Sequence, residues 1–78
     1  MVYQGPTLVK YMTHNEWYYV GPMQEMYRID SPTLMNEIFG EDWRSSVQLL
    51  PSHMYEGRIV QETLIRYNRR IAEEWANR

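Results

Sequence analysis

Residues 8–20 constrain the fold of this chain more than any other segment, because they predict a β-hairpin that has no polar side. Residues 8–13 and 17–20 are rich in β-branched and aromatic side chains, which favour strands. Between them, His14 and Asn15 predict a two-residue turn, since asparagine tolerates the positive φ angle that such turns need.

This turn sorts the side chains of the hairpin into two faces. It places Met12 opposite Trp17 and Tyr11 opposite Tyr18. Because side chains alternate across a strand, one face carries Leu8, Met12, Trp17 and Tyr19, and the other carries Val9, Tyr11, Tyr18 and Val20. A sheet with one solvated face alternates apolar and polar residues. Neither of these faces is polar, so both need a cover.

The next segments predict three more short elements. Residues 23–29 predict a third strand after the Gly21-Pro22 turn, which completes an antiparallel meander. Residues 31–40 predict a helix of about two turns, opened by a serine cap and a proline and ended by a glycine. Residues 43–50 fit either a helix or a strand. We favour a fourth strand there, because paired serines fill a helix poorly and a proline closes the run.

The C-terminal segment predicts a long helix of about 18–20 residues within residues 58–78. Its apolar side chains recur at spacings of four, three, four and four, and they are Val60, Leu64, Tyr67, Ile71 and Trp75. On the opposite face, Glu62 and Arg66, and Arg70 and Glu74, are placed for ion pairs four residues apart.

These elements predict one α+β domain over residues 1–78. A small antiparallel sheet of three or four strands packs against the long C-terminal helix, with one short helix inserted, in the order βββαβα. Two interpretations remain for the second sheet face. Either the short helix and residues 51–57 cover it, or another molecule does.

Tyrosine and tryptophan favour the second interpretation, because they bury a large area and tolerate water at their polar ends. The sequence therefore predicts a partner-binding surface made by Tyr11, Trp17, Tyr18 and Tyr19. A homodimer is the expected assembly, since two-fold dimers are the commonest oligomers.

Charge adds a second candidate surface. Residues 1–57 carry three basic and seven acidic side chains, a net −4, whereas residues 58–78 carry five arginines and three glutamates, a net +2. Arg66, Arg69 and Arg70 lie on adjacent turns of the predicted helix. They fit a solvated, salt-bridged helix face, contact with nucleic acid, or an acidic protein partner.

The chain carries no recognisable catalytic motif. His14 and His53 stand apart in predicted turns, and the four glycines do not form a phosphate loop. A ribonuclease-like site could use His14 or His53 with Arg28 and Tyr27. The net charge of −2 argues against it, because such an enzyme must first hold a polyanion. We therefore expect no enzyme, no cofactor and no metal site.

The composition also bounds the cellular setting. The 78 residues include no cysteine, so disulfide and zinc-finger spacings are absent. No run of about 18 apolar residues predicts a membrane span, and the N-terminus lacks the pattern of a signal peptide. These features predict a cytoplasmic protein.

The leading hypothesis is a small non-enzymatic protein-binding regulator or inhibitor that blocks a surface of a larger host or defence complex. Its contacts are predicted to be Tyr11, Trp17, Tyr18, Tyr19, Arg66, Arg69 and Arg70. A cysteine-free, motif-free chain rich in aromatic residues is typical of accessory proteins encoded by viruses or mobile elements. The alternative hypothesis is a nucleic-acid-binding regulator that uses the arginine side of the C-terminal helix.

Overall fold

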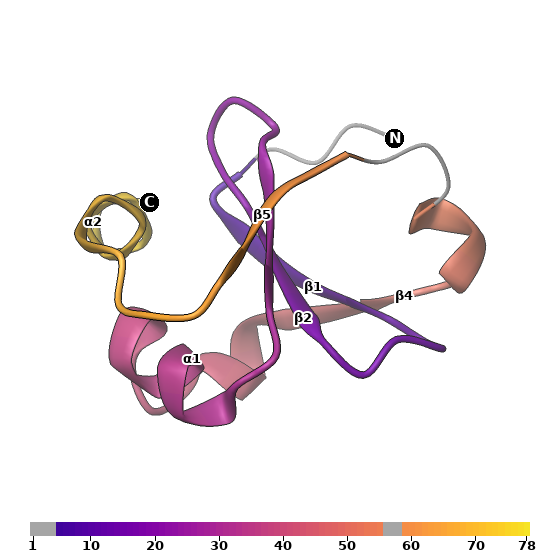
Figure 1. Cartoon of the computed structure of the whole chain (residues 1–78), viewed down its shortest axis with the longest axis horizontal. Helices are drawn as coiled ribbons and strands as arrows, with labels where there is room; N and C mark the ends of the chain where they lie inside the picture. Colours follow the sequence, from indigo (N-terminus) through magenta and orange to yellow (C-terminus); the bar gives the residue numbers. More distant parts are fainter. Residues whose placement is uncertain (1–4, 56–58) are drawn as a thin grey trace.

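The computed structural model describes residues 5–55 and 59–78, which form a five-stranded mixed sheet with helices against it (Figure 1). The strands are β1 (Thr7–Tyr11), β2 (Trp17–Val20), β3 (Met26–Ile29), β4 (Val47–Leu50) and β5 (Val60–Leu64). The α-helices are α1 (Pro32–Phe39) and α2 (Arg69–Ala76), and the 3-10 turns are η1 (Trp43–Ser46) and η2 (Ser52–Tyr55). The predicted α+β class is confirmed.

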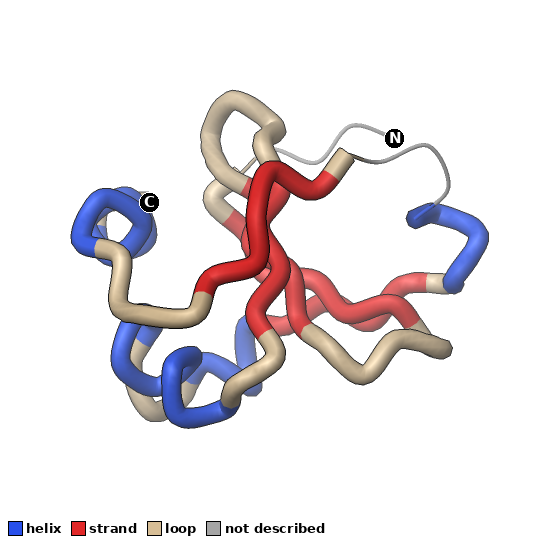
Figure 2. Tube along the Cα trace, in the orientation of Figure 1, coloured by secondary structure: helices blue, strands red, loops and turns tan. Residues whose placement is uncertain are grey.

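The strands lie in the order β4-β1-β2-β3-β5. The first three form the predicted antiparallel meander, but β4 pairs with β1 and β5 pairs with β3 in parallel. An entirely antiparallel sheet is therefore wrong. Parallel neighbours need a crossover connection, and the chain makes one crossing through α1 and η1 and another through η2 (Figure 2).

The hairpin register differs from the predicted one by two residues. Leu8 pairs with Tyr19 and Val9 with Tyr18, so a longer loop replaces the two-residue turn. The His14 N–H closes part of this loop by donating to the Tyr11 carbonyl at 2.9 Å. Because side chains alternate with a period of two, a shift of two residues leaves the strand side chains on their predicted faces, whereas Met12 lies beyond β1 and is exposed.

The first sheet face packs against α1, α2 and η1. Ser31 caps α1, since its Oγ accepts from the Leu34 N–H at 3.2 Å. Gly40 ends α1 with φ of 91°, which glycine adopts readily. The predicted short helix is thus confirmed. The buried side chains of this core are Leu8, Tyr19, Tyr27, Ile29, Leu34, Met35, Ile38, Phe39, Trp43, Leu64, Ile71 and Trp75.

The second sheet face is covered by the segment that carries η2. Its buried side chains are Val9, Tyr11, Tyr18, Val20, Met26 and Leu50, and Met54, Tyr55 and Val60 pack against them. Of the two interpretations, this arrangement agrees with the one in which residues 51–57 cover the face. The structure describes residues 51–55 of that segment. Residues 56–57 lie outside the described part. The short helix α1, however, packs on the first face instead.

The predicted long C-terminal helix is wrong, because residues 60–64 form β5 and only Arg69–Ala76 are helical. β-Branched Val60 and Thr63 favour a strand, and β3 offers it a partner edge. A bulge separates the Met26–Val60 pair from the Tyr27–Glu62 pair. The bulge sends Val60 to the second core and Leu64 to the first.

The predicted fourth strand occupies only the second half of residues 43–50. Trp43–Ser46 form the turn η1, and Val47–Leu50 form β4. Ser45 stabilises the turn, since its Oγ donates to the Asp42 carbonyl at 2.8 Å. Serine side chains often compete with regular structure in this way.

Candidate functional site

The predicted aromatic surface lies mostly inside one chain. Tyr11, Tyr18 and Tyr19 are each 0% exposed, and Trp17 is half-buried. Three of the four rings that were predicted to contact a partner are therefore buried within the chain. The physical reason is that Tyr55 of η2 packs on Tyr11 and Tyr18, with ring centroids 5.1 and 5.5 Å apart. The surplus of apolar ring surface that favoured a second copy is taken up by the chain's own cores.

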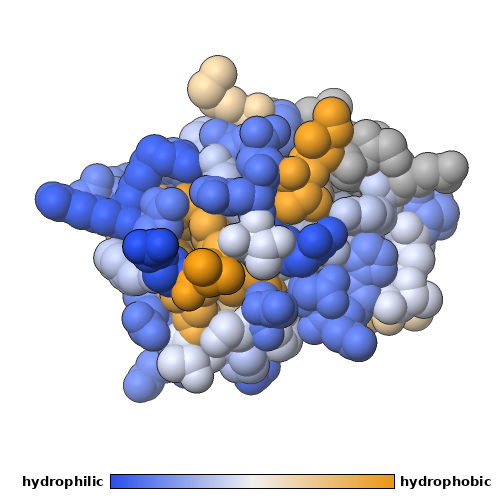
Figure 3. Space-filling model, viewed as in Figure 1, coloured by the Kyte–Doolittle hydropathy of each residue, from blue (hydrophilic) through white to orange (hydrophobic). Residues whose placement is uncertain are grey.

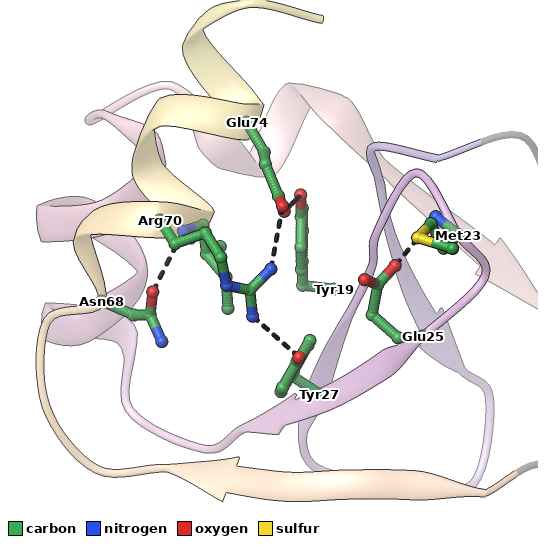
Figure 4. A network of polar contacts seen from close by, with 8 residues as sticks. Tyr19, Met23, Glu25, Tyr27, Asn68, Arg70 and Glu74 are labelled. Carbon is green, nitrogen blue, oxygen red and sulfur yellow. Dashed lines mark hydrogen bonds and ion pairs between the residues drawn. The ribbon is translucent and has the colours of Figure 1, made fainter.

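Tyr19 belongs to a polar network that fastens α2 to the sheet (Figure 4). Its hydroxyl donates to Glu74 Oε1 at 2.7 Å. Arg70 contacts Glu74 Oε2 through Nη1 at 2.8 Å and donates from Nη2 to the Tyr27 hydroxyl, also at 2.8 Å. Burial, and then the bond to Glu74, raise the pKa of Tyr19. The predicted Arg70–Glu74 pair is confirmed, and the contacts of Arg70 are structural.

The other arginines of this region differ in their pairing. Arg69 contacts Glu73 at 2.9 Å on the exposed side of α2. The predicted pairing of Glu62 with Arg66 on one helical face is wrong, because both residues precede α2. Arg66 is exposed and makes no ion pair with the described residues. A salt-bridged helix face thus describes Arg69 and Arg70 but leaves Arg66 available.

The outer edge of β5 is flanked by exposed apolar side chains. β5 ends the sheet, so its outer backbone groups face away from β3. Ile59, Ile65 and Tyr67 flank it and are 76%, 80% and 50% exposed. A pocket of about 330 Å³ is lined by residues 62–68. With β5 in front, apolar side chains emerge at separate places on an otherwise hydrophilic face (Figure 3).

Sequence reasoning missed the β5 edge because the helical spacing of residues 60–75 concealed it. The signal that could have found it is the series of β-branched residues Ile59, Val60, Thr63 and Ile65. Such residues are common in strands and less favourable in helices.

A second group of polar side chains gathers on the second sheet face. The Tyr18 hydroxyl lies 2.7 Å from His14 Nδ1 and donates to Glu16 Oε1 at 3.4 Å. Arg28 donates from Nη2 to the Tyr55 hydroxyl at 3.2 Å. Burial raises the pKa of Tyr18, and hydrogen bonding to Tyr18 raises the pKa of Arg28.

This group contains part of the ribonuclease-like set that the sequence suggested. The structure brings His14 and Arg28 together, but Tyr27 points to the opposite face and bonds Arg70. His53 is an exposed residue of η2. Within residues 5–55 and 59–78, no group of three histidine and carboxylate side chains is placed to hold a metal ion.

The fold and these surfaces define a small α+β protein with a two-sided core and an edge strand, β5, that is flanked by exposed apolar side chains. Comparison with models of protein families, with curated proteins and with solved structures finds no match to this chain. No helix in the described part of the chain is long and apolar enough to cross a membrane.

Proposed function

We propose that this chain is a small non-enzymatic regulator that binds another protein through the outer edge of β5 and through residues 65–68, which connect β5 to α2. The observation that carries the proposal is an edge strand flanked by the exposed side chains of Ile59, Ile65 and Tyr67. An extended segment of a partner can add a strand to such an edge, and neighbouring side chains then select its sequence. Binding there would block the partner's own use of that segment.

The charges near this edge support a partner segment that carries an acidic residue. Arg66 lies between Ile65 and Tyr67 in the lining of the pocket, and it lacks an ion pair with the described residues. An arginine fork can bind a carboxylate through two parallel hydrogen bonds. Tyrosine and arginine are also the side chains that dominate binding hot spots.

Nucleic-acid binding is the alternative, and the exposed pair Arg66 and Tyr67 favours it. A base could stack on the tyrosine ring while the arginine holds a phosphate. Against this stand the ion pairs of Arg69 with Glu73 and of Arg70 with Glu74, which compensate two of the three arginine charges. We therefore favour the protein partner. The aromatic, cysteine-free composition supports the further proposal of a cytoplasmic regulator or inhibitor of a host or defence complex, encoded by a virus or mobile element.

Panning a phage-displayed library of random peptides against the chain tests the proposal. We expect the selected peptides to perturb the amide NMR signals of residues 59–69. The substitution Ile65→Asp should weaken their binding at least tenfold, because a charge enters the apolar contact. Leu49→Asp is the matched control, since Leu49 is 63% exposed on the opposite edge strand β4 and should leave binding unchanged.

Three outcomes would contradict the proposal. One is perturbation that maps to β4 or to the second sheet face. Another is retention of single-stranded RNA or DNA that falls steeply with salt and disappears in Arg66→Gln, which would favour the nucleic-acid alternative. The third is a stable dimer in light scattering that Ile65→Asp converts to a monomer, because a second copy would then occupy the edge.

A further inference from the structure

Arg28 lies on β3, next to the edge strand β5, and shares the second sheet face with its cross-strand neighbour Tyr18. Its register partners are Tyr18 on β2 and Thr63 on β5. Its guanidinium carbon lies 5.7 Å from the centroid of the Tyr18 ring, and the Tyr55 hydroxyl accepts from Nη2. These contacts hold the guanidinium in one place, so a ligand would not have to order a flexible side chain.

The hydrogen-bonding capacity of this guanidinium is incompletely used. An arginine carries five N–H donors, yet Arg28 Nε is buried and makes no hydrogen bond within residues 5–55 and 59–78. The nearest charge is Glu16, whose Oε1 lies 3.8 Å from Nε. That separation exceeds hydrogen-bond distance. Buried donors are nearly always satisfied in native proteins, so Nε is the unused donor of this group.

His14 packs against the same two tyrosine rings and brings a second nitrogen-bearing side chain to this group. Its Nδ1 is engaged with the Tyr18 hydroxyl at 2.7 Å, and its ring packs on Tyr55 with centroids 4.5 Å apart. Its other nitrogen, Nε2, makes no hydrogen bond with the described residues. When the imidazole is protonated, both ring nitrogens donate.

We propose that Arg28, His14 and Tyr55 form a binding site for a phosphate group. The oxyanion accepts from the Arg28 fork and from the imidazole, and it displaces the carboxylate of Glu16, whose Oε1 lies 3.8 Å from Nε and accepts from the Tyr18 hydroxyl. The side chains of Arg28 and Glu16 are 35% and 31% exposed, so a ligand reaches them from solvent. The site shares no contact residue with the β5 edge surface, although Arg28 lies on β3 beside β5.

Titration with inorganic phosphate tests the site, with potassium chloride at equal ionic strength as the reference. We expect the NMR signal of the Arg28 Nε–H to shift with phosphate and not with chloride. Glu16→Gln should tighten phosphate binding about fivefold, because it removes one competing charge about 4 Å away in a water-like medium. Arg28→Lys keeps a positive charge but removes the fork, and it should abolish the saturable shift.

Arg44→Gln is the matched control, since Arg44 also stacks on an aromatic ring, that of Trp43, with its guanidinium carbon 4.3 Å from the centroid. It should bind phosphate as the parent chain does. A parallel titration with N-acetyl-phosphoserine amide distinguishes free phosphate from a phosphorylated side chain as the source. If the Arg28 signal stays unmoved in both the parent chain and Glu16→Gln, or if Glu16→Gln weakens binding, the proposal is wrong.

Discussion

At the scale of single residues, Tyr19 joins the sheet to the last helix through one hydroxyl group. Its ring is buried in the first core, and its hydroxyl donates to Glu74 at the far end of the chain. Tyr19→Phe should therefore lower the free energy of unfolding by about 1.5–3 kcal/mol, as expected for a lost hydrogen bond to a charged acceptor. Urea unfolding measures this change in the free energy of unfolding. Tyr67→Phe, at a half-exposed ring, is the control and should change it by less than about 0.5 kcal/mol.

The same buried hydroxyls predict how stability depends on pH. The pKa values of Tyr18 and Tyr19 are raised in the folded chain, chiefly by burial. Above about pH 10, tyrosines in the unfolded chain lose protons that the folded chain keeps. The contribution of Tyr18 and Tyr19 to the free energy of unfolding should thus be constant below about pH 10 and should fall above it. Each tyrosine contributes a slope of at most about 1.4 kcal/mol per pH unit.

Urea unfolding between pH 8 and pH 11 checks this dependence. Tyr19→Phe should show a shallower fall above pH 10 than the parent chain, because one of the two shifted groups is gone. An equal or steeper fall in that variant would mean that Tyr19 does not ionise more readily on unfolding.

At the scale of elements, the C-terminal segment shows why spacing alone misled. Val60, Leu64, Ile71 and Trp75 fit one helical stripe, yet they belong to two elements. We expect ¹³Cα chemical shifts below random-coil values over residues 60–64 and above them over residues 69–76. Shifts that stay above random-coil values without interruption from residue 59 to 76 would restore the single helix.

Asn68 is the N-cap residue of α2. Its Oδ1 accepts from the Ile71 N–H at 3.0 Å and so satisfies one of the unpaired donors of the first turn. Asn68→Ala should lower the free energy of unfolding by about 1 kcal/mol. Asn15→Ala, in the exposed hairpin loop, is the control for losing an asparagine. Equal effects of the two substitutions in urea unfolding would exclude a capping role.

Local patterns predicted the elements whose signals agreed with one another. The meander, the capped helix α1 and the two faces of the hairpin follow from alternation, turn residues and Ser31. The positions of β4 and β5 do not, because they depend on which edges of the meander are open, a property of the assembled sheet. For the same reason the sequence placed Tyr11 and Tyr18 at the surface, although Tyr55 covers them.

At the scale of the whole molecule, the chain crosses its sheet once on each face before adding an outer strand. The meander needs only short loops, whereas β4 and β5 join partners that are distant in sequence. Closing long loops costs more chain entropy, and distant pairings slow folding. We therefore expect the meander to be formed in the folding transition state and β5 to join after it.

The neighbouring core residues Ile29 and Leu64 give a matched test of this order. Ile29→Val and Leu64→Val each remove one methyl or methylene group, worth about 1 kcal/mol. In stopped-flow experiments, Ile29→Val should mainly slow folding and Leu64→Val should mainly speed unfolding. Equal slowing of folding by both would refute the order. The strand β5, whose outer edge we propose as the partner's binding site, is then the last strand to join the sheet during folding and the first to separate from it during unfolding.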